Sequence, residues 1–374
     1  MRWRRPSEWL DRLLNIGKEF AGSGPFHRRR LSNISIRLSV SGVRGKSTAV
    51  RWLHDVFHDR GYETYAKVTG VVPASVYNDF EYEIERGVAV RLYENERELK
   101  RFESPDVAIF ENQGIREYTT RLVNQQFVRP QVVFLTNVRE DHLDTMGGSR
   151  QAVARSLARS IPGGTHVVSG EQNPQIRDYL ERELDRRDAT ITHVTVPARH
   201  ETVPGAEIVY GIDLVLQAVD EPPLSPTERE SLLDQMDVSW THLPAGRIFN
   251  AAAANDVQST ELIRRHLLSD ADEVIQPVVY LRSDRRGRTA SFLRYLTKLA
   301  EQGAIEQARV VGEDADLFAL NTSFPVVVHD ETRESPTELL DSALADCWPV
   351  MVAGNTVSEF MTELAADIEQ RRTE

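Results

Sequence analysis

The chain has 374 residues, enough for two or three domains with complete hydrophobic cores. Its composition of 40% hydrophobic and 27% charged residues is typical of a soluble globular protein, and no apolar run reaches the length of a membrane-spanning helix. The net charge of −12 argues against nucleic-acid binding, and the single cysteine, Cys347, excludes an internal disulfide and is expected to be buried. We therefore expect a cytoplasmic protein that binds no nucleic acid.

Residues 1–31 form a basic segment that differs from the rest of the chain. They include eight basic and three acidic residues, a net charge of +5. From about Ser7 the apolar residues recur at helical spacing, which predicts an amphipathic helix. Two interpretations stay open: a helix packed on the domain surface, or a peripheral helix that contacts the inner face of the cell membrane or a membrane partner.

Strands and helices alternate from Ser32 onward, which predicts an α/β domain with a mostly parallel sheet. Strands are expected at residues 34–40, 63–68, 106–110, 131–137, 165–169 and 190–196, and helices at residues 48–60, 116–126 and 149–160. Residues 197–245 are rich in proline and polar residues and are predicted to join this domain to a second one. We place an ATP-binding central domain at residues 32–240 and a smaller Rossmann-like α/β domain at residues 241–374.

The turn after the first of these strands has the pattern of a phosphate-binding loop. Residues 42–48 read Gly-Val-Arg-Gly-Lys-Ser-Thr and lie between a predicted strand and a predicted helix. Glycines allow the backbone to wrap an anion, the N–H groups of the helix N-terminus point at it, and a lysine adds a positive charge. The predicted phosphate contacts come from Gly42, Arg44, Gly45, Lys46, Ser47 and Thr48, and the hydroxyl of Ser47 is also a predicted Mg²⁺ ligand.

Polar residues also follow two further strands of the predicted sheet. Glu111 comes directly after the strand at residues 106–110, and Asn137 and His142 follow the strand at residues 131–137. Ligands of parallel sheets bind at the carboxyl ends of the strands. Either Glu111 or His142 alone would be read as a structural residue. Beside a phosphate turn, the two predict an Mg²⁺ site together with Ser47.

The second domain presents a smaller set of candidate residues. Its expected strand at residues 276–281 ends in Arg282, Asp284 and Arg285, a further set of charged residues at a strand end, for which an exposed turn is the alternative to a functional role. Arg247 and Asn250 lie near the start of this domain.

These motifs together resemble the central domain of the Mur ligase superfamily, and most closely the catalytic subunit of poly-γ-glutamate synthases (PgsB/CapB). The specific matches are the phosphate turn with its internal Arg44, the segment 67–70 (Lys-Val-Thr-Gly), Glu111 and the segment 136–147. Weaker matches in the second domain lie at residues 250–256, 282–289, 311–313 and 354–355. The resemblance spans about residues 32–360.

The resemblance implies an ATP-dependent acid–amino-acid ligase that works with ATP and Mg²⁺. Such an enzyme phosphorylates a carboxylate of glutamate or of a γ-glutamyl chain, and an amine then attacks the acyl phosphate. It implies catalytic roles for Lys46, Glu111 and His142, nucleotide contacts from Asn137, Arg247, Asn250, Arg282, Asp284 and Arg285, and a small integral-membrane synthase subunit as a partner. An oligomer is compatible with these features.

The chain also departs from some members of the superfamily. Only about 31 residues precede the phosphate strand, where peptidoglycan ligases carry a nucleotide-sugar domain, so a UDP-sugar substrate is not expected. No lysine lies between Lys100 and Lys298, so the carbamylated lysine of many of those ligases has no counterpart. A folylpolyglutamate-synthase-like ligase and a non-catalytic ATP-binding module stay as alternatives. The amino-acid substrate and its stereochemistry are left open.

Overall fold

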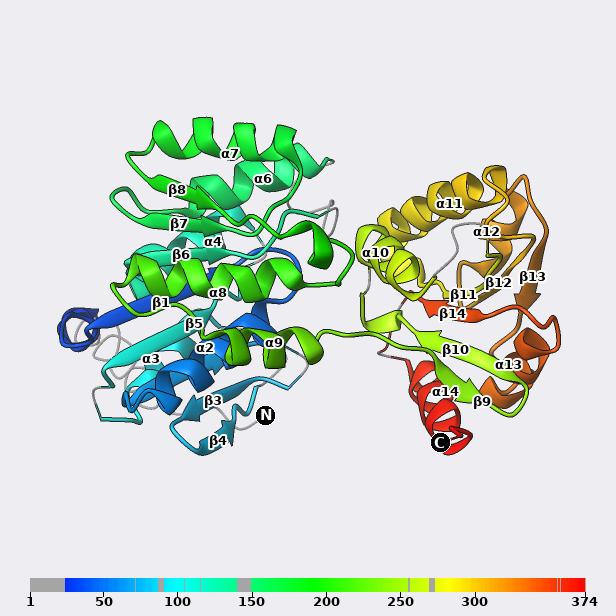
Figure 1. Cartoon of the computed structure of the whole chain (residues 1–374), viewed down its shortest axis with the longest axis horizontal. Helices are drawn as coiled ribbons and strands as arrows, with labels where there is room; N and C mark the ends of the chain where they lie inside the picture. Colours follow the sequence, from blue (N-terminus) through cyan, green and yellow to red (C-terminus); the bar gives the residue numbers. More distant parts are fainter. Residues whose placement is uncertain are drawn as a thin grey trace, which may run out of the picture. The chain divides into compact units, whose positions relative to one another are not determined.

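The computed structural model describes residues 24–70, 72–86, 91–103, 105–114, 116–139, 149–254, 256–268, 273–354, 356 and 358–373. His142 and the predicted helix that starts near Ser7 therefore fall outside the described residues, apart from the helical residues 24–32. The chain forms two compact units (Figure 1). Unit 1 comprises Met1–Val138, Thr145–Thr195 and Glu207–Ser225, and unit 2 comprises Arg139–Asp144, Val196–Ala206 and Pro226–Glu374. The predicted boundary at residue 240 lies inside unit 2, and the assignment of functional domains stays a prediction.

Unit 1 is built on an eight-stranded sheet with the strand order β4-β3-β2-β5-β1-β6-β7-β8. The strands are β1 (Ile36–Ser41), β2 (Thr64–Val68), β3 (Ala74–Tyr77), β4 (Phe80–Glu83), β5 (Val107–Glu111), β6 (Val132–Leu135), β7 (His166–Ser169) and β8 (Thr190–His193). In the order β2-β5-β1-β6-β7-β8, all neighbouring strands are parallel, which confirms the predicted sheet. The antiparallel strands β3 and β4 were not predicted, because their residues lie in a polar segment with many turn-forming residues.

Helices cover both faces of this sheet. They are α2 (Lys46–Asp59), α3 (Glu94–Leu99), α4 (Glu117–Leu122), η1 (Val123–Val128), α6 (Arg150–Ser160), α7 (Pro174–Asp185) and α8 (Ala206–Ala218). The short turn η2 (Ala198–His200), which precedes α8, belongs to unit 2. Gly211 of α8 lies so close to Phe134 of β6 that a Cβ would come within 2.3 Å of the ring. On the opposite face, Ser39 of β1 donates a hydrogen bond to Asn124 of η1 at 2.7 Å.

The helix α8 corrects the prediction that residues 197–245 form a junction. Ile208, Val209, Ile212, Val215 and Leu216 are buried on one side of α8. Ala206, Tyr210 and Leu214 add apolar side chains on its other sides, so the helix is apolar around most of its circumference. A helix of this kind lacks the one-sided periodicity by which a helix is recognised in a sequence.

Unit 2 contains a six-stranded sheet with the order β13-β12-β11-β14-β10-β9, which is parallel except for the pair β9 and β10. Its strands are β9 (Thr241–Leu243), β10 (Gly246–Asn250), β11 (Gln276–Tyr280), β12 (Ala308–Val311), β13 (Val326–His329) and β14 (Val350–Ala353). Its helices are α9 (Pro226–Asp234), η3 (Ala252–Ala254), α10 (Val257–Leu267), η4 (Ser283–Arg285), α11 (Arg286–Glu301), α12 (Ala315–Leu320), α13 (Pro336–Leu344) and α14 (Glu359–Gln370). This arrangement confirms the predicted Rossmann-like α/β fold.

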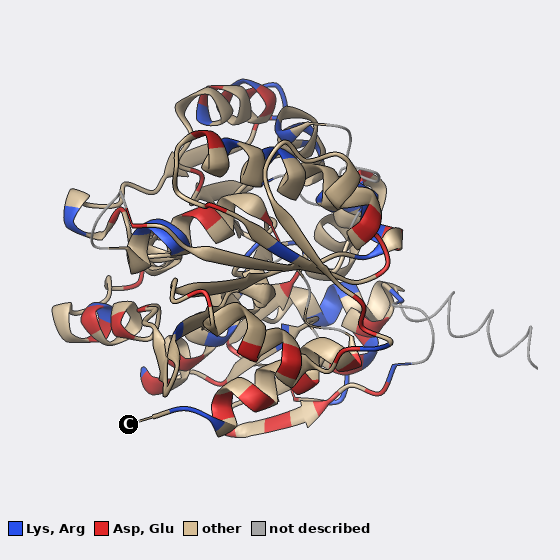
Figure 2. Cartoon of the chain, turned by 90° about the vertical axis from the view of Figure 1, so that its right-hand side faces the viewer, with Lys and Arg blue, Asp and Glu red and all other residues tan. Residues whose placement is uncertain are grey.

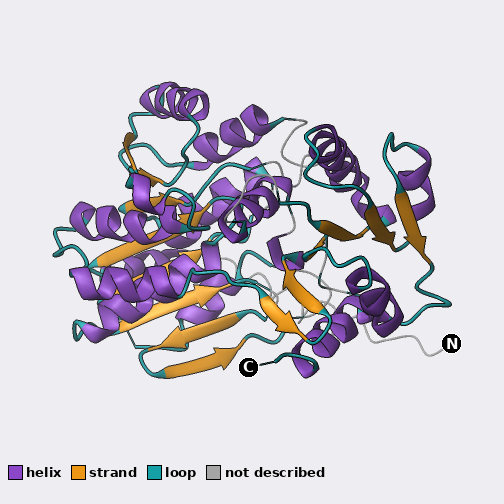
Figure 3. Cartoon of the chain, turned by 45° about the vertical axis from the view of Figure 1, so that its right-hand side comes forward, coloured by secondary structure: helices purple, strands orange, loops and turns teal. Residues whose placement is uncertain are grey.

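Adjacent residues of β11 point into two different cores of unit 2. Val279 packs in a cluster with Phe292 of α11, whereas Val278 packs in a second cluster with Leu340 of α13. Helices therefore flank both faces of the sheet, as the purple ribbons of Figure 3 show. Cys347, which was expected to be buried, is exposed instead, because it lies in the surface turn between α13 and β14. Among the described residues, no helix is long and apolar enough to cross a bilayer.

The turn after β12 provides a test of this fold. Gly312 and Gly303 both have positive φ, at +103° and +72°, so alanine at either position costs about 1–2 kcal/mol of backbone strain. A Cβ at Gly312 would also lie 2.2 Å from the Leu281 carbonyl oxygen, whereas no atom lies within 4 Å at Gly303. Chemical denaturation should therefore show Gly312→Ala to be less stable than Gly303→Ala by about 1–3 kcal/mol. Equal losses would contradict the close approach at Gly312.

Candidate active site

The phosphate turn joins β1 to α2 and depends on two glycines. Gly42 has φ +119°, and a Cβ there would lie 2.3 Å from the Thr136 hydroxyl oxygen. Gly45 has φ +75°, and a Cβ there would lie 2.2 Å from Ile208 of α8. Both positions therefore require glycine, because a side chain would meet strained backbone and occupied space. The turn is consequently fixed against the end of β6 and the start of α8.

The residues after Gly45 form the first turn of α2, which begins at Lys46, two residues earlier than predicted. Lys46, Ser47 and Thr48 are thus placed where the free N–H groups of a helix N-terminus are found. The Nζ atom of Lys46 folds back and donates to the Val43 carbonyl oxygen at 3.2 Å. The predicted strand, turn and helix are therefore present with the lysine next to the turn.

Asn137 holds the phosphate turn in place from the end of β6. Its Oδ1 accepts a hydrogen bond from the Arg44 N–H at 3.0 Å, and its Nδ2 donates to the Arg44 carbonyl at 3.2 Å. Its own carbonyl accepts a hydrogen bond from the Val43 N–H at 3.3 Å, and Nδ2 also contacts Glu207 at 3.3 Å. Asn137 is only 5% exposed, so its side-chain amide bonds to the turn and not to solvent. The predicted direct contact of Asn137 with a nucleotide stays a prediction.

Ser47 and Glu111 come together beside this turn. The Ser47 hydroxyl donates to Glu111 Oε2 at 2.9 Å, and the Thr69 N–H donates to the same oxygen at 2.7 Å. Glu111 lies at the end of β5 and is only 4% exposed. A hydroxyl and a carboxylate are hard oxygen ligands, so this pair fits a divalent cation such as Mg²⁺.

The predicted third ligand, His142, lies outside the described residues, so its position is not tested. In the part of the chain that the structure describes, no group of three His, Cys, Asp or Glu residues could hold a metal. Glu171 contacts described residues before and after the segment that contains His142. This buried carboxylate accepts from the Val138 N–H at 2.9 Å and from Arg150 at 2.7 Å.

A buried ion-pair network supports Thr69 and was not predicted. Lys67 is fully buried, and its Nζ lies 2.9 Å from Glu94. Arg86 forms a two-pronged ion pair with Glu94 at 2.8 and 2.7 Å, and it also donates to the Thr69 carbonyl at 3.1 Å. Burial lowers the pKa of Lys67, and the charge of Glu94 opposes this effect. The network therefore connects a buried lysine of β2 to the backbone that holds Glu111.

The candidate residues of unit 2 are engaged with their neighbours. Arg282 forms a two-pronged pair with Asp284 at 2.8 and 2.7 Å, and this pairing lowers the pKa of Asp284. Arg247 is ion-paired with Glu273 and lies over the Trp240 ring, 5.0 Å from its centroid.

Two further candidates differ in their surroundings. Asn250 accepts a hydrogen bond from the Ala252 N–H at 3.1 Å, so its side chain shapes the turn after β10. Arg285 lines a cleft of about 810 Å³ in unit 2, together with Asp284.

Comparisons with known proteins identify relatives of this chain. A family model described as the poly-gamma-glutamate synthase CapB C-terminal domain matches residues 242–371. The capsule biosynthesis protein CapB of Bacillus anthracis is 28% identical over 174 residues, which are 44% of this chain and 36% of that protein. PGA synthase CapB of Bacillus subtilis (strain 168) is 21% identical over 291 residues, which are 71% of this chain and 72% of that protein.

A solved structure resembles the chain over most of its length. It is the bifunctional folylpolyglutamate synthase/dihydrofolate synthase of Yersinia pestis in complex with AMPPNP and a Mn ion, with a TM-score of 0.62 and 17% identity. The match covers 92% of this chain and 91% of that chain. These comparisons confirm the resemblance to the Mur ligase superfamily and its poly-γ-glutamate synthase branch, and they confirm the fold.

The Asn137 contacts can be tested by the change Asn137→Ala. It leaves the Arg44 N–H and carbonyl without their side-chain partner, which should cost about 1–3 kcal/mol and loosen the phosphate turn. We expect at least about fivefold weaker binding of ADP, measured by calorimetric titration. Asn124→Ala is the matched control, because Asn124 is a buried amide of the same unit that bonds to Ser39 and Asn112. Equal ADP affinities in the two variants would contradict the role given to Asn137.

Proposed function

We propose that this relative of the poly-γ-glutamate synthases is an ATP-dependent acid–amino-acid ligase. It activates a carboxylate of glutamate, or of a γ-glutamyl chain, as an acyl phosphate and joins it to the amine of an amino acid. The observation that carries this proposal is the contact of Ser47 with Glu111 beside a lysine-containing phosphate turn. This arrangement offers oxygen ligands for a divalent cation at the place where a γ-phosphate would bind. The names of the curated relatives agree with it.

The chemistry requires two anions to approach each other, a carboxylate and the γ-phosphate of ATP. In our proposal, Lys46 and the N–H groups of the turn hold the β- and γ-phosphates. Ser47, Glu111 and His142 hold Mg²⁺, which supplies the positive charge that offsets the repulsion between the two anions. Arg44 and Thr48 complete the phosphate site. Asn137 keeps the turn in the conformation that these contacts need.

The proposed reaction has two steps. A carboxylate oxygen forms a bond to the γ-phosphorus, and the bond from that phosphorus to ADP breaks. The amine nitrogen then attacks the acyl carbon and loses a proton, and phosphate leaves with the former carboxylate oxygen. Arg247, Asn250, Arg282, Asp284 and Arg285 are proposed to contact the nucleotide during this sequence.

Two further elements complete the proposal. From its basic, amphipathic character we propose that the segment 1–31 contacts the inner face of the cell membrane, while His27 and Leu31 near its end are buried in unit 1. From the family resemblance we propose that a small integral-membrane subunit works with this chain. The fold is also that of the folylpolyglutamate synthases, so a folate acceptor is a second candidate substrate. An acceptor panel that includes a folate monoglutamate distinguishes the two.

The first test is the change Lys46→Ala. Loss of the only side-chain cation in the first turn of α2 should abolish the release of ADP, because the phosphates lose a direct charge contact. We expect turnover to fall by at least about 100-fold, or about 3 kcal/mol. The assay measures ADP with ATP, Mg²⁺ and glutamate, γ-glutamyl oligomers or folate. Lys100→Ala is the matched control, since Lys100 is exposed and follows α3. Unchanged turnover in Lys46→Ala would remove the basis of the proposal.

The second test is the change Glu111→Gln. Glutamine keeps an oxygen acceptor for Ser47 and Thr69, so the fold should persist, but the negative charge that favours a cation is lost. We expect the Mn²⁺ concentration for half-saturation to rise at least about tenfold, measured by electron paramagnetic resonance with a non-hydrolysable ATP analogue. His142→Ala should act in the same direction. Glu117→Gln, which changes a half-exposed carboxylate of α4, serves as the control. Unchanged Mn²⁺ binding in Glu111→Gln would rule out Glu111 as a ligand.

A further inference from the structure

A basic cleft lies between α10 and α11 of unit 2 and has a volume of about 810 Å³. Six positively charged residues line it, against three acidic ones, although the chain as a whole carries a net charge of −12. The positive residues are Arg265, Arg285, Arg286, Arg288, Arg294 and Lys298. Figure 2 shows basic and acidic residues together on helices of the chain. The excess of positive residues in the cleft is therefore a local feature.

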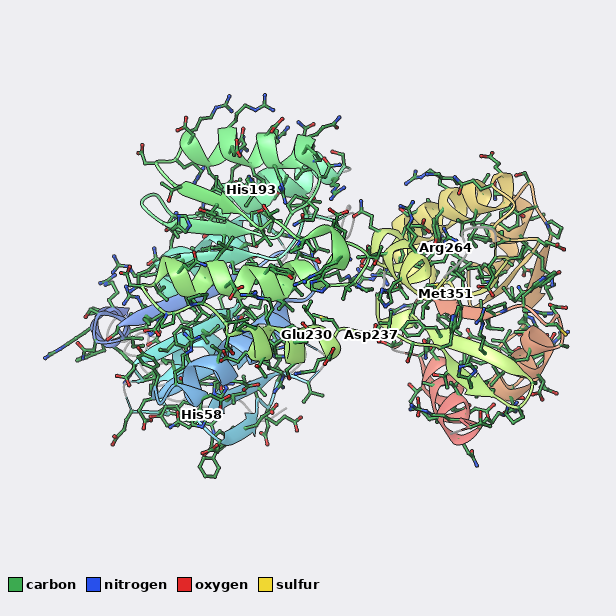
Figure 4. All side chains as sticks on the ribbon, in the orientation of Figure 1. His58, His193, Glu230, Asp237, Arg264 and Met351 are labelled. Carbon is green, nitrogen blue, oxygen red and sulfur yellow. The ribbon has the colours of Figure 1, made fainter. Side chains whose placement is uncertain are left out.

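The acidic residues of the cleft are already engaged by neighbouring groups. Burial opposes the ionisation of Glu261, but hydrogen bonds from Arg264, Arg265 and Tyr295 outweigh it and lower the pKa of Glu261 to about 2. Arg264, which Figure 4 labels on α10, lies 2.8 Å from the Glu261 carboxylate, and the Tyr295 hydroxyl also lies 2.8 Å from it. Glu261 therefore stays ionised and neutralised by its partners.

The other two carboxylates of the cleft are occupied as well. Asp284 is held by Arg282 in the two-pronged pair described above. Asp256 caps the N-terminus of α10 by accepting from the Ser259 N–H at 2.9 Å. Each of the three acidic side chains of the cleft therefore already has a partner.

Several of these cations are available to a ligand. Arg286 and Lys298 are exposed and form no ion pair with any residue that the structure describes. Arg294 is also exposed, and its guanidinium donates to the Ser291 hydroxyl at 3.3 Å. Arg294 and Lys298 are four residues apart on α11, so they lie on the same side of the helix, about 6 Å apart. From Arg286 to Lys298 the helix extends about 18 Å.

We propose that this cleft binds the γ-glutamyl chain, with its free carboxylates paired to the cations of α11. This inference rests on the proposed function, which supplies the identity of the chain. Each γ-linked unit adds five main-chain bonds, so its carboxylates repeat about every 6 Å when the chain is extended. This spacing matches one turn of α11, and the cleft accommodates about three units. The apolar side chains of Val257, Leu262 and Leu299, which also line the cleft, suit the two methylene groups of each unit.

The test is direct binding of fluorescent γ-glutamyl oligomers of one, three and six units to the full chain, without ATP. Affinity should rise from one unit to three units and fall with added salt, because several charge pairs form along the cleft. The double change Arg294→Gln with Lys298→Gln should weaken binding of the six-unit oligomer by about three- to thirtyfold, as expected for the loss of two exposed ion pairs. A six-unit α-linked oligoglutamate should bind more weakly, since its carboxylates repeat at a different spacing.

The matched control is Arg333→Gln with Arg372→Gln, which removes the same charge from two exposed positions of unit 2. This control should leave oligomer binding unchanged within about twofold, and both double variants should keep the unfolding midpoint of the parent chain. Equal weakening in both double variants, or equal binding of α- and γ-linked oligomers, would reduce the effect to general charge attraction and overturn the proposal. A loss of ADP binding instead of oligomer binding would also overturn it, by assigning the cleft to the nucleotide. The binding assay contains no ATP, so its result does not depend on turnover. If the chain binds oligomers in this length-dependent way but releases no ADP in the separate turnover assay, the result supports the role of the cleft and contradicts the ligase activity.

Discussion

The hydrogen bonds between Asn137 and the backbone of Arg44 fix the phosphate turn, and the rest of the candidate site depends on that turn. They tie the loop after β1 to the end of the neighbouring strand β6. The close approach of Gly42 to Thr136 leaves the loop no space to shift. The first turn of α2 is thereby directed so that the Ser47 hydroxyl meets Glu111 at the end of β5. A buried amide thus positions the residues that would meet ATP.

Much of this arrangement could be predicted from the sequence, because it follows from local rules. A strand, a glycine turn and a helix in succession give the phosphate site. Glu111 and Asn137 each follow a buried strand, and parallel strands bring their carboxyl ends to one edge of the sheet. The strand order places β5 and β6 on either side of β1, so both residues reach the turn.

The parts that could not be predicted depend on partners far apart in the chain or on atypical elements. Lys67 and Glu94 are 27 positions apart, and nothing in the spacing of a polar segment indicates that they pair in the interior. The helix α8 is buried around most of its surface, so it lacks the one-sided pattern of an ordinary surface helix. Cys347 is exposed in the turn between α13 and β14, a position in the fold that residue type alone does not reveal.

If a substrate carboxylate is activated by phosphorylation, one of its oxygen atoms leaves with the released phosphate, so the fate of that oxygen reports on the reaction. The full chain would be incubated with ATP, Mg²⁺, an amino-acid acceptor and glutamate or a γ-glutamyl oligomer whose carboxylates carry ¹⁸O. The released phosphate would be analysed by ³¹P nuclear magnetic resonance. We expect each phosphate formed to contain an oxygen atom from the carboxylate, since phosphate leaves the acyl carbon with that oxygen. Phosphate free of ¹⁸O, formed at the same rate with or without the acceptor, would mean simple ATP hydrolysis and would contradict the activation of a carboxylate.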